Sequence, residues 1–95
     1  MNTSSDRRLR PTLTAKASTS ADGLVLLDVN GGLVLASNLV GARIWQLIEQ
    51  RNTAAEIARQ LVIEYAVSDD RANEDVAAFL AALVDRGLVS EDATV

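Results

Sequence analysis

Residues 23–48 read GLVLLDVNGGLVLASNLVGARIWQLI, and the spacing of apolar side chains changes within this stretch. An apolar run over 24–29 is followed by Asn30-Gly31 and by a second apolar run over 33–36. Asn-Gly between two apolar runs is a strong local signal for a β-hairpin. From Ser37 onward the apolar side chains recur about every 3.6 residues, which is typical of a helix. We therefore predict a hairpin that leads directly into a helix.

The residues before this stretch predict a third strand beside the hairpin. Residues 12–20 are rich in Thr and Ser, with a loose alternation of apolar side chains. Asp22-Gly23 supplies a turn, because Gly tolerates a positive φ and Asp tolerates the left-handed region. Three strands joined by two tight turns form an antiparallel meander.

Three helices are predicted after the strands. The first begins at Ser37 or Asn38 and contains Trp45 as an anchor of the core. Thr53 and Glu56 have the spacing of a capping box at the start of the second helix. The third covers 69–86 and is followed by a glycine cap. The expected inward-facing residues include Ile44, Leu47 and Ile48 on the first helix, Ile57, Leu61 and Tyr65 on the second, and Val76, Phe79, Leu80, Leu83 and Val84 on the third.

This order of elements predicts an α+β fold similar to a winged helix-turn-helix, with a three-stranded antiparallel sheet followed by three helices. We expect residues 12–89 to form the domain, with a disordered N-terminal tail over 1–11 and a C-terminal tail over 90–95. The 95 residues are 48% hydrophobic with a net charge of −4, which suits one globular core. Residues 1–14 lack the apolar region of a secretory signal, and no apolar run approaches the roughly 18 residues of a membrane span. We therefore expect a cytoplasmic protein that does not bind membranes.

The composition argues against an enzyme and against a metal or cofactor site. The chain has no Cys and no His, so it lacks the usual nucleophile, general base and transition-metal ligands. Asp69, Asp70, Glu74 and Asp75 are the acidic group nearest to a divalent-ion site. We interpret them as solvated acids at a helix start, because the helix dipole favours negative charge there.

A winged-helix order also suggests DNA binding, which the charge of the third helix disfavours. Its two arginines, Arg71 and Arg86, stand against five acidic residues, a net charge of −3 over 69–86. A helix that reads duplex DNA normally carries several basic residues that neutralise phosphates. We expect no nucleic acid partner, and a small regulatory winged-helix domain that binds another protein or DNA is the alternative function.

An ordered series of residues over 22–89 resembles the PqqD family. The series comprises Gly23-Leu24-Val25-Leu26-Leu27-Asp28, Asn38 with Gly41-Ala42-Arg43-Ile44-Trp45, Thr53-Ala54-Ala55-Glu56-Ile57, Asp75-Val76 with Phe79-Leu80, and Leu83 with Gly87-Leu88. The family includes the pyrroloquinoline-quinone (PQQ) biosynthesis protein D and the leader-binding proteins of lasso-peptide clusters, together called RiPP recognition elements. Many lasso-type relatives carry aromatic residues and a Leu-Asn pair in the third strand, where this chain has LVLASN over 33–38.

The resemblance implies a peptide chaperone of ribosomal natural-product biosynthesis that is not itself an enzyme. Such a protein binds the leader of a precursor peptide as an added strand and presents it to a radical SAM protein or a leader peptidase. The implied peptide-binding edge is Leu33, Val34, Leu35, Ala36 and Ser37, and the implied helix wall is Ala72, Asp75, Val76, Phe79, Ala82 and Leu83. Phe79 is expected to anchor an apolar leader side chain, and Asp75 to meet a basic one. The same open edge leaves a homodimer as a further expectation.

Overall fold

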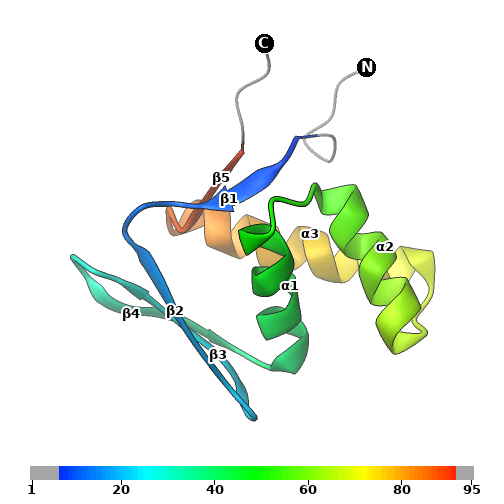
Figure 1. Ribbon diagram of the computed structural model, residues 1–95, viewed down its shortest axis with the longest axis horizontal. Helices are drawn as coiled ribbons and strands as arrows, with labels where there is room; N and C mark the ends of the chain where they lie inside the picture. The colour runs from blue at the N-terminus through cyan, green and yellow to red at the C-terminus, as the bar shows by residue number, and fades with distance from the viewer. Residues whose placement is uncertain (1–6, 92–95) are drawn as a thin grey trace.

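The three predicted strands form one antiparallel sheet in the order β2-β3-β4 (Figure 1). The computed structural model describes residues 7–91, apart from the side chains of Leu33 and Val34. The strands are β2 (Ala15–Ser20), β3 (Gly23–Asp28) and β4 (Gly32–Ser37). The predicted hairpin turn is present, because the Asn30 backbone N–H donates to the side chain of Asp28 at 2.9 Å. The prediction of an α+β meander followed by three helices is confirmed.

The strand β4 is an edge of this sheet and contains an irregularity. Leu26 of β3 is opposite Leu35, whereas Leu27 is opposite Leu33, so Val34 is one extra residue in β4. Such a bulge bends and twists the strand that contains it. Among the described strands, β4 pairs with β3 alone, and its outer backbone edge has no strand beside it.

The three helices are α1 (Leu39–Glu49), α2 (Ala54–Tyr65) and α3 (Asp69–Asp85). Of the two candidate caps for α1, the structure selects Asn38, whose Oδ1 accepts from the Gly41 N–H at 3.0 Å. The capping box predicted for α2 is present, with Thr53 and Glu56 each bonding the other's backbone N–H. These polar groups satisfy backbone donors that a helix start leaves without partners.

The core lies between β3 and the inner faces of the helices. Trp45 is 1% exposed and donates from its indole N–H to Glu49 Oε2 at 2.9 Å, which confirms it as a core anchor. Two expected core positions are wrong, since Tyr65 is 43% and Val84 is 56% exposed. Tyr65 is the last residue of α2, and Val84 is one position past the buried Leu83, about 100° around the helix.

A short second sheet corrects the predicted tails. β1 (Leu9–Pro11) pairs antiparallel with β5 (Val89–Glu91), and Leu9 is 2% exposed. The Leu9 N–H also donates to the Asn52 carbonyl at 3.0 Å. Residues 9–11 and 90–91 are therefore part of the fold. Each of these short strands is paired with a strand about eighty residues away, and no local sequence pattern reveals such a pairing. The predicted tails over 1–6 and 92–95 lie outside the described residues.

A carboxylate on α2 joins α1 to α2 at the surface. Arg43 donates to Glu64 from Nε at 2.8 Å and from Nη2 at 2.6 Å, and Gln60 also donates to Glu64. These bonds hold the pKa of Glu64 below its ordinary value, and the Glu64 carboxylate raises the pKa of Arg43.

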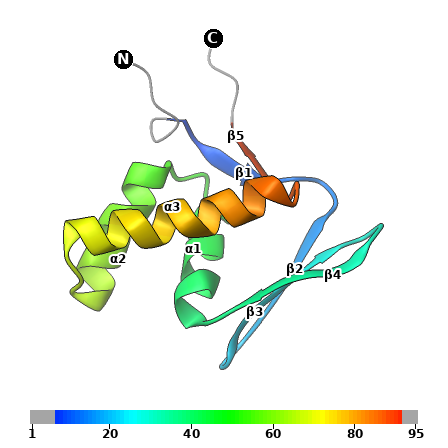
Figure 2. The ribbon, with the colours of Figure 1, turned by 180° about the vertical axis from the view of Figure 1, so that it is seen from behind.

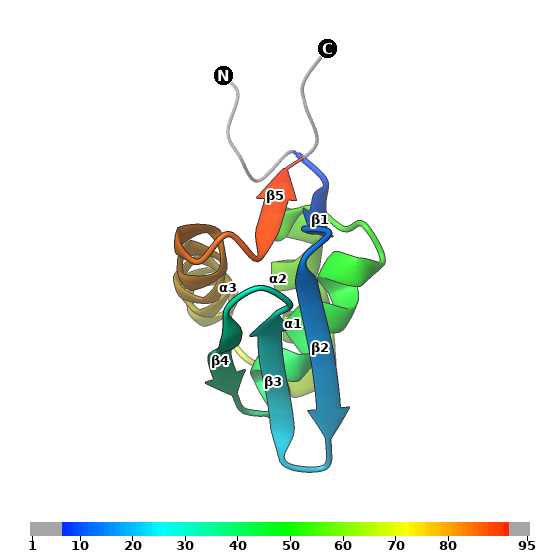
Figure 3. The same cartoon turned by 90° about the vertical axis from the view of Figure 1, so that its left-hand side faces the viewer.

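The sheet projects away from the helices, and its edge strand β4 lies on the same side of the molecule as α3 (Figures 2 and 3). β4 runs from the hairpin tip, near the C-terminal end of α3, back toward the start of α1 (Figure 2).

Over residues 7–91, the structure contains no helix with the length and apolar character that crossing a membrane requires.

Candidate functional site

A groove of about 450 Å³ lies where the end of β4, the start of α1 and one face of α3 meet. Its position follows from the chain order, because β4 passes into α1 through Ser37 and Asn38, and both residues line it. The residues of α3 that line it share one face of the helix, at spacings of three or four. The full lining is Ser37, Asn38, Val40, Gly41, Ile44, Arg71, Asp75, Ala78, Phe79 and Ala82.

Phe79 of α3 lies against the first turn of α1. A β-carbon at Gly41 would lie 3.2 Å from Cε1 of Phe79 and would collide with the side chain of Ser37. Phe79 itself is half-buried, so part of its ring stays open to the groove. Ala78 and Ala82 flank it with small side chains, which leaves space over the ring.

An ion pair occupies the N-terminal part of the groove. Arg71 Nε lies 3.2 Å from Oδ2 and 3.4 Å from Oδ1 of Asp75, four residues later on α3. The side chain of Arg71 is 67% exposed and that of Asp75 is 43% exposed. One half of the groove is therefore apolar and surrounds Phe79. The other half contains one positive and one negative side chain, whose charges cancel.

The structure brings together only part of the predicted site. Ser37 of the edge strand and three predicted α3 residues line the groove, namely Asp75, Phe79 and Ala82. Of the other predicted edge residues, Leu35 is half-buried and Ala36 is exposed. The backbone of Leu33 and Val34 belongs to β4, but their side chains are not among those that the structure describes.

Three predicted wall residues are not surface residues. Ala72, Val76 and Leu83 are at most 2% exposed and belong to the core, so the expectation that they line the groove is corrected. They face the core because α3 packs one stripe inward, and the groove residues Arg71, Asp75 and Ala78 project from a different side of the helix.

Sequence reasoning missed Arg71, Ala78 and the first turn of α1 as groove residues. Arg71 was counted only toward the charge of α3, although its spacing of four from Asp75 is a signal for a helical ion pair. The contribution of Gly41 and Val40 depends on how α1 crosses α3, and no local pattern contains that angle.

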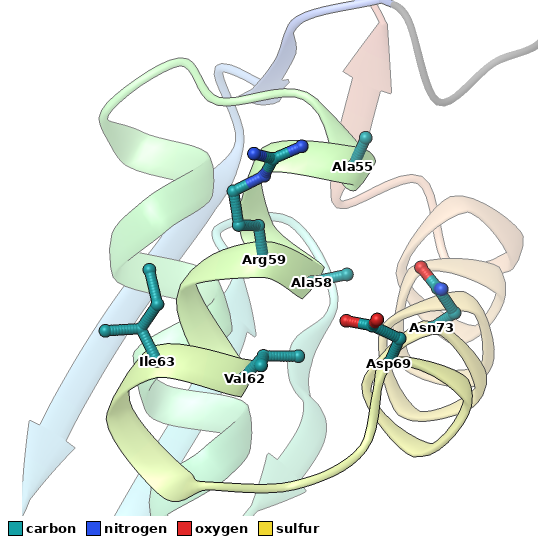
Figure 4. A pocket seen from close by; sticks show the side chains of 7 residues that line it. All are labelled: Ala55, Ala58, Arg59, Val62, Ile63, Asp69 and Asn73. Atoms are coloured by element: carbon teal, nitrogen blue, oxygen red, sulfur yellow. The ribbon is translucent and has the colours of Figure 1, made fainter.

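A second hollow, of about 540 Å³, lies between α2 and α3 (Figure 4). Asp69 and Asn73 of α3 face Ala58 and Val62 of α2 across it (Figure 4). It is larger than the groove beside β4, but no strand edge borders it among its lining residues. We assign the candidate site to the groove, because there the end of the edge strand β4 meets apolar side chains of α3.

The groove contains few groups that perform chemistry. Its charged groups are one guanidinium and one carboxylate, which bond each other. Within residues 7–91, no three acidic side chains converge in a way that would hold a metal ion. The arrangement is suited to binding an extended chain, with backbone bonds on one side and side-chain contacts on the other.

Comparison with known proteins identifies the family. The family model of the Coenzyme PQQ synthesis protein D (PqqD) matches residues 23–89. The solved structure of TbiB1 in complex with the TbiA(beta) leader peptide is similar, with a TM-score of 0.77 and 28% identity over 90% of this chain and 99% of that chain. Lasso peptide synthetase B1 complexed with the leader peptide has a TM-score of 0.74 and 28% identity over 86% and 96% of the two chains. No curated protein matches this chain.

The matched region begins at the first residue of β3 and ends at the first residue of β5, so it contains β4, α3 and all of the groove. It also accounts for most of the chain, and the two solved structures are similar in fold over 90% and 86% of this chain. The protein therefore belongs to the PqqD family.

Proposed function

We propose that this protein binds the leader segment of a ribosomally synthesised precursor peptide as an added strand on β4 and presents it to a modifying enzyme. The observation behind the proposal is the unpaired edge of β4, which ends at Ser37 inside the groove that Phe79 lines. Both solved relatives are complexes with a leader peptide, which supports the same class of ligand here.

The edge strand supplies register and much of the affinity in this proposal. An unpaired strand edge presents a row of N–H and C=O groups that an extended peptide bonds without regard to its side chains. The meander provides no further strand for this edge, because the chain turns into α1 at Asn38. Within the part of the chain that the structure describes, the outer edge of β4 is therefore free to pair with a peptide.

The α3 side of the groove supplies selection. The exposed part of Phe79 and the small side chains at Ala78 and Ala82 form an apolar seat next to the added strand. The volume of about 450 Å³ falls in the range of ligand pockets, roughly 300–1,000 Å³. An apolar leader side chain fits this seat, because burying it removes apolar surface from water on both partners.

The protein acts without catalysis in this proposal, since the groove holds no nucleophile beside a base. The chemistry then belongs to a partner enzyme, either a radical SAM protein or a leader peptidase. The charge of α3 continues to disfavour the alternative of DNA binding, and a gel shift with duplex DNA at physiological salt should show no complex.

Peptides selected from a displayed library of random 15-residue chains provide the test. Bound to the ¹⁵N-labelled protein, they should shift the amides of residues 35–37 and of the groove face of α3. Shifts confined to α2 would contradict the proposal.

Two neighbouring alanines on α3 give a matched pair of variants. Ala82→Glu places a charge in the groove, whereas Ala81→Glu makes the same change at an exposed position outside the groove lining. We expect Ala82→Glu to weaken binding of the selected peptides by about tenfold or more and Ala81→Glu to leave it within about twofold. Thermal melts of both variants show whether the fold is retained.

A further inference from the structure

We infer that the groove selects leader segments with an acidic residue four positions before a large apolar residue, and that Arg71 is the residue that reads the acid. The inference rests on the proposed function and names the class of peptide that the site accepts. It replaces the sequence-based expectation of a basic leader residue at Asp75.

Arg71 is the charged group with free capacity. Among the described residues, its two hydrogen bonds to Asp75 both run from Nε, which leaves the terminal nitrogens of the guanidinium out of this pair, and the side chain is 67% exposed. Those nitrogens have the geometry to bond a carboxylate in a fork. Both oxygens of Asp75 already accept from Arg71, so a basic leader residue would have to compete with that bond.

The helix geometry sets the spacing. Arg71 and Phe79 are eight residues apart on α3, which is about 12 Å along the helix axis at about 1.5 Å per residue. An extended peptide advances about 3.3 Å per residue and returns to the same face every second residue. Four peptide residues therefore span about 13 Å, which matches the distance from Phe79 to Arg71.

The sheet sets the direction. β4 runs from the C-terminal end of α3 toward the start of α1 (Figure 2), and the groove continues from Ser37 along α3 to Arg71. Every strand pair within residues 7–91 is antiparallel. A leader that pairs antiparallel with β4 passes Arg71 first, then Phe79, and then the edge of β4. The acidic residue therefore precedes the apolar one.

The test compares selections from one displayed library of random 15-residue peptides on four forms of the protein. These are the wild type, Arg71→Gln, the control Arg59→Gln, and the exchange of Arg71→Asp with Asp75→Arg. Arg59 is an exposed arginine of α2 in the second hollow, so the control removes the same charge outside the groove. The exchange keeps a pair of opposite charges at the same spacing while it moves the cation one turn closer to Phe79.

The wild type and Arg59→Gln should enrich Asp or Glu four positions before the enriched apolar residue, and Arg71→Gln should lose that preference. In the exchange variant the cation lies four residues from Phe79, about 6 Å, so the acid should move to two positions before the apolar residue. In a selected peptide, replacing the acid by its amide should weaken wild-type binding about tenfold and Arg71→Gln binding less than about twofold.

The outcomes separate this inference from the proposed function. Peptides that shift the amides of Ser37 and Phe79 but show no acidic preference, or prefer Lys or Arg, overturn the inference and leave strand addition on β4 intact. If no peptides are enriched, or if those enriched act at α2 alone, the proposed function fails and the inference fails with it.

Discussion

A β-carbon on Gly41 of α1 would lie 3.2 Å from Cε1 of Phe79 on α3, so the two helices meet here with no space for a side chain on the α1 side. The same hypothetical carbon would collide with the side chain of Ser37, the last residue of β4. One glycine therefore sets how closely the edge strand, α1 and α3 approach one another, and the groove lies at that junction.

Gly41→Ala should destabilise the domain, although Gly→Ala inside a helix normally stabilises it by up to about 1 kcal/mol. We expect a loss of about 1–3 kcal/mol in the free energy of unfolding, because Ser37 and Phe79 must both move. Denaturant melts measure the change. Gly31→Ala is the control, since a β-carbon there meets nothing closer than 3.8 Å and should be nearly neutral. Adding Ser37→Gly should recover part of the loss in Gly41→Ala, and a stabilised Gly41→Ala would contradict the close packing.

Replacing Trp45 and replacing Phe79 by alanine should have different effects on stability and on peptide binding. Trp45 is 1% exposed, and Trp45→Ala should lower the free energy of unfolding by about 3–5 kcal/mol, enough to unfold much of a domain this small. Phe79 is half-buried, so Phe79→Ala should cost on the order of 1–3 kcal/mol and weaken binding of library-selected peptides about tenfold. Denaturant melts and fluorescence anisotropy distinguish the two effects. If Phe79→Ala unfolds the protein while a folded Phe79→Leu binds normally, Phe79 is a core residue.

Leu9→Ala should destabilise the domain by about 2–5 kcal/mol, because the side chain is 2% exposed and β1 closes the fold against β5. Leu13→Ala makes the same change four residues away at a side chain that is 98% exposed, and its melting midpoint should match that of the wild type. Thermal and denaturant melts of the two variants provide the comparison. Equal midpoints for both variants would mean that the segment over 7–11 is a tail after all.

The bonds from Arg43 to Glu64 should make stability depend on acid pH. The pKa of Glu64 is lowered in the folded state, first by the Arg43 bond and then by the Gln60 bond, from an ordinary value of about 4.5. The stabilisation is therefore complete above that value and is lost as the pH falls through the lowered folded pKa. At neutral pH, Glu64→Gln should lower the thermal midpoint by about 2–6 °C. At about pH 3 the difference in thermal midpoint between Glu64→Gln and the wild type should be smaller. If that difference is the same at both pH values, the charge of Glu64 does not contribute to stability.

Much of the candidate site follows from local pattern, and the rest depends on how distant segments meet. The strand β4 and the helical stripe that contains Phe79 were predictable, because a hairpin signal and a helical stripe each lie within a few residues. Their assignment to a peptide-binding site came from the resemblance to the PqqD family and not from these patterns. Ala72, Val76 and Leu83 were misplaced, since a helix with apolar residues on two adjoining faces does not reveal which face the other helices cover. Arg71 and Gly41 enter the groove through the crossing of α1 and α3, which local spacing does not contain.

The sequence alone determined the meander, the three helices and the capping box of α2, because each depends on side chains within one turn or one hairpin. Tertiary structure decided which face of α3 is open, that Gly41 must be a glycine, and that β1 and β5 form a second sheet. Leu9 and Val89 are eighty residues apart, and a three-residue strand has too few side chains to show a pattern. Such short strands form only because the folded chain brings their backbone groups together and excludes water from them.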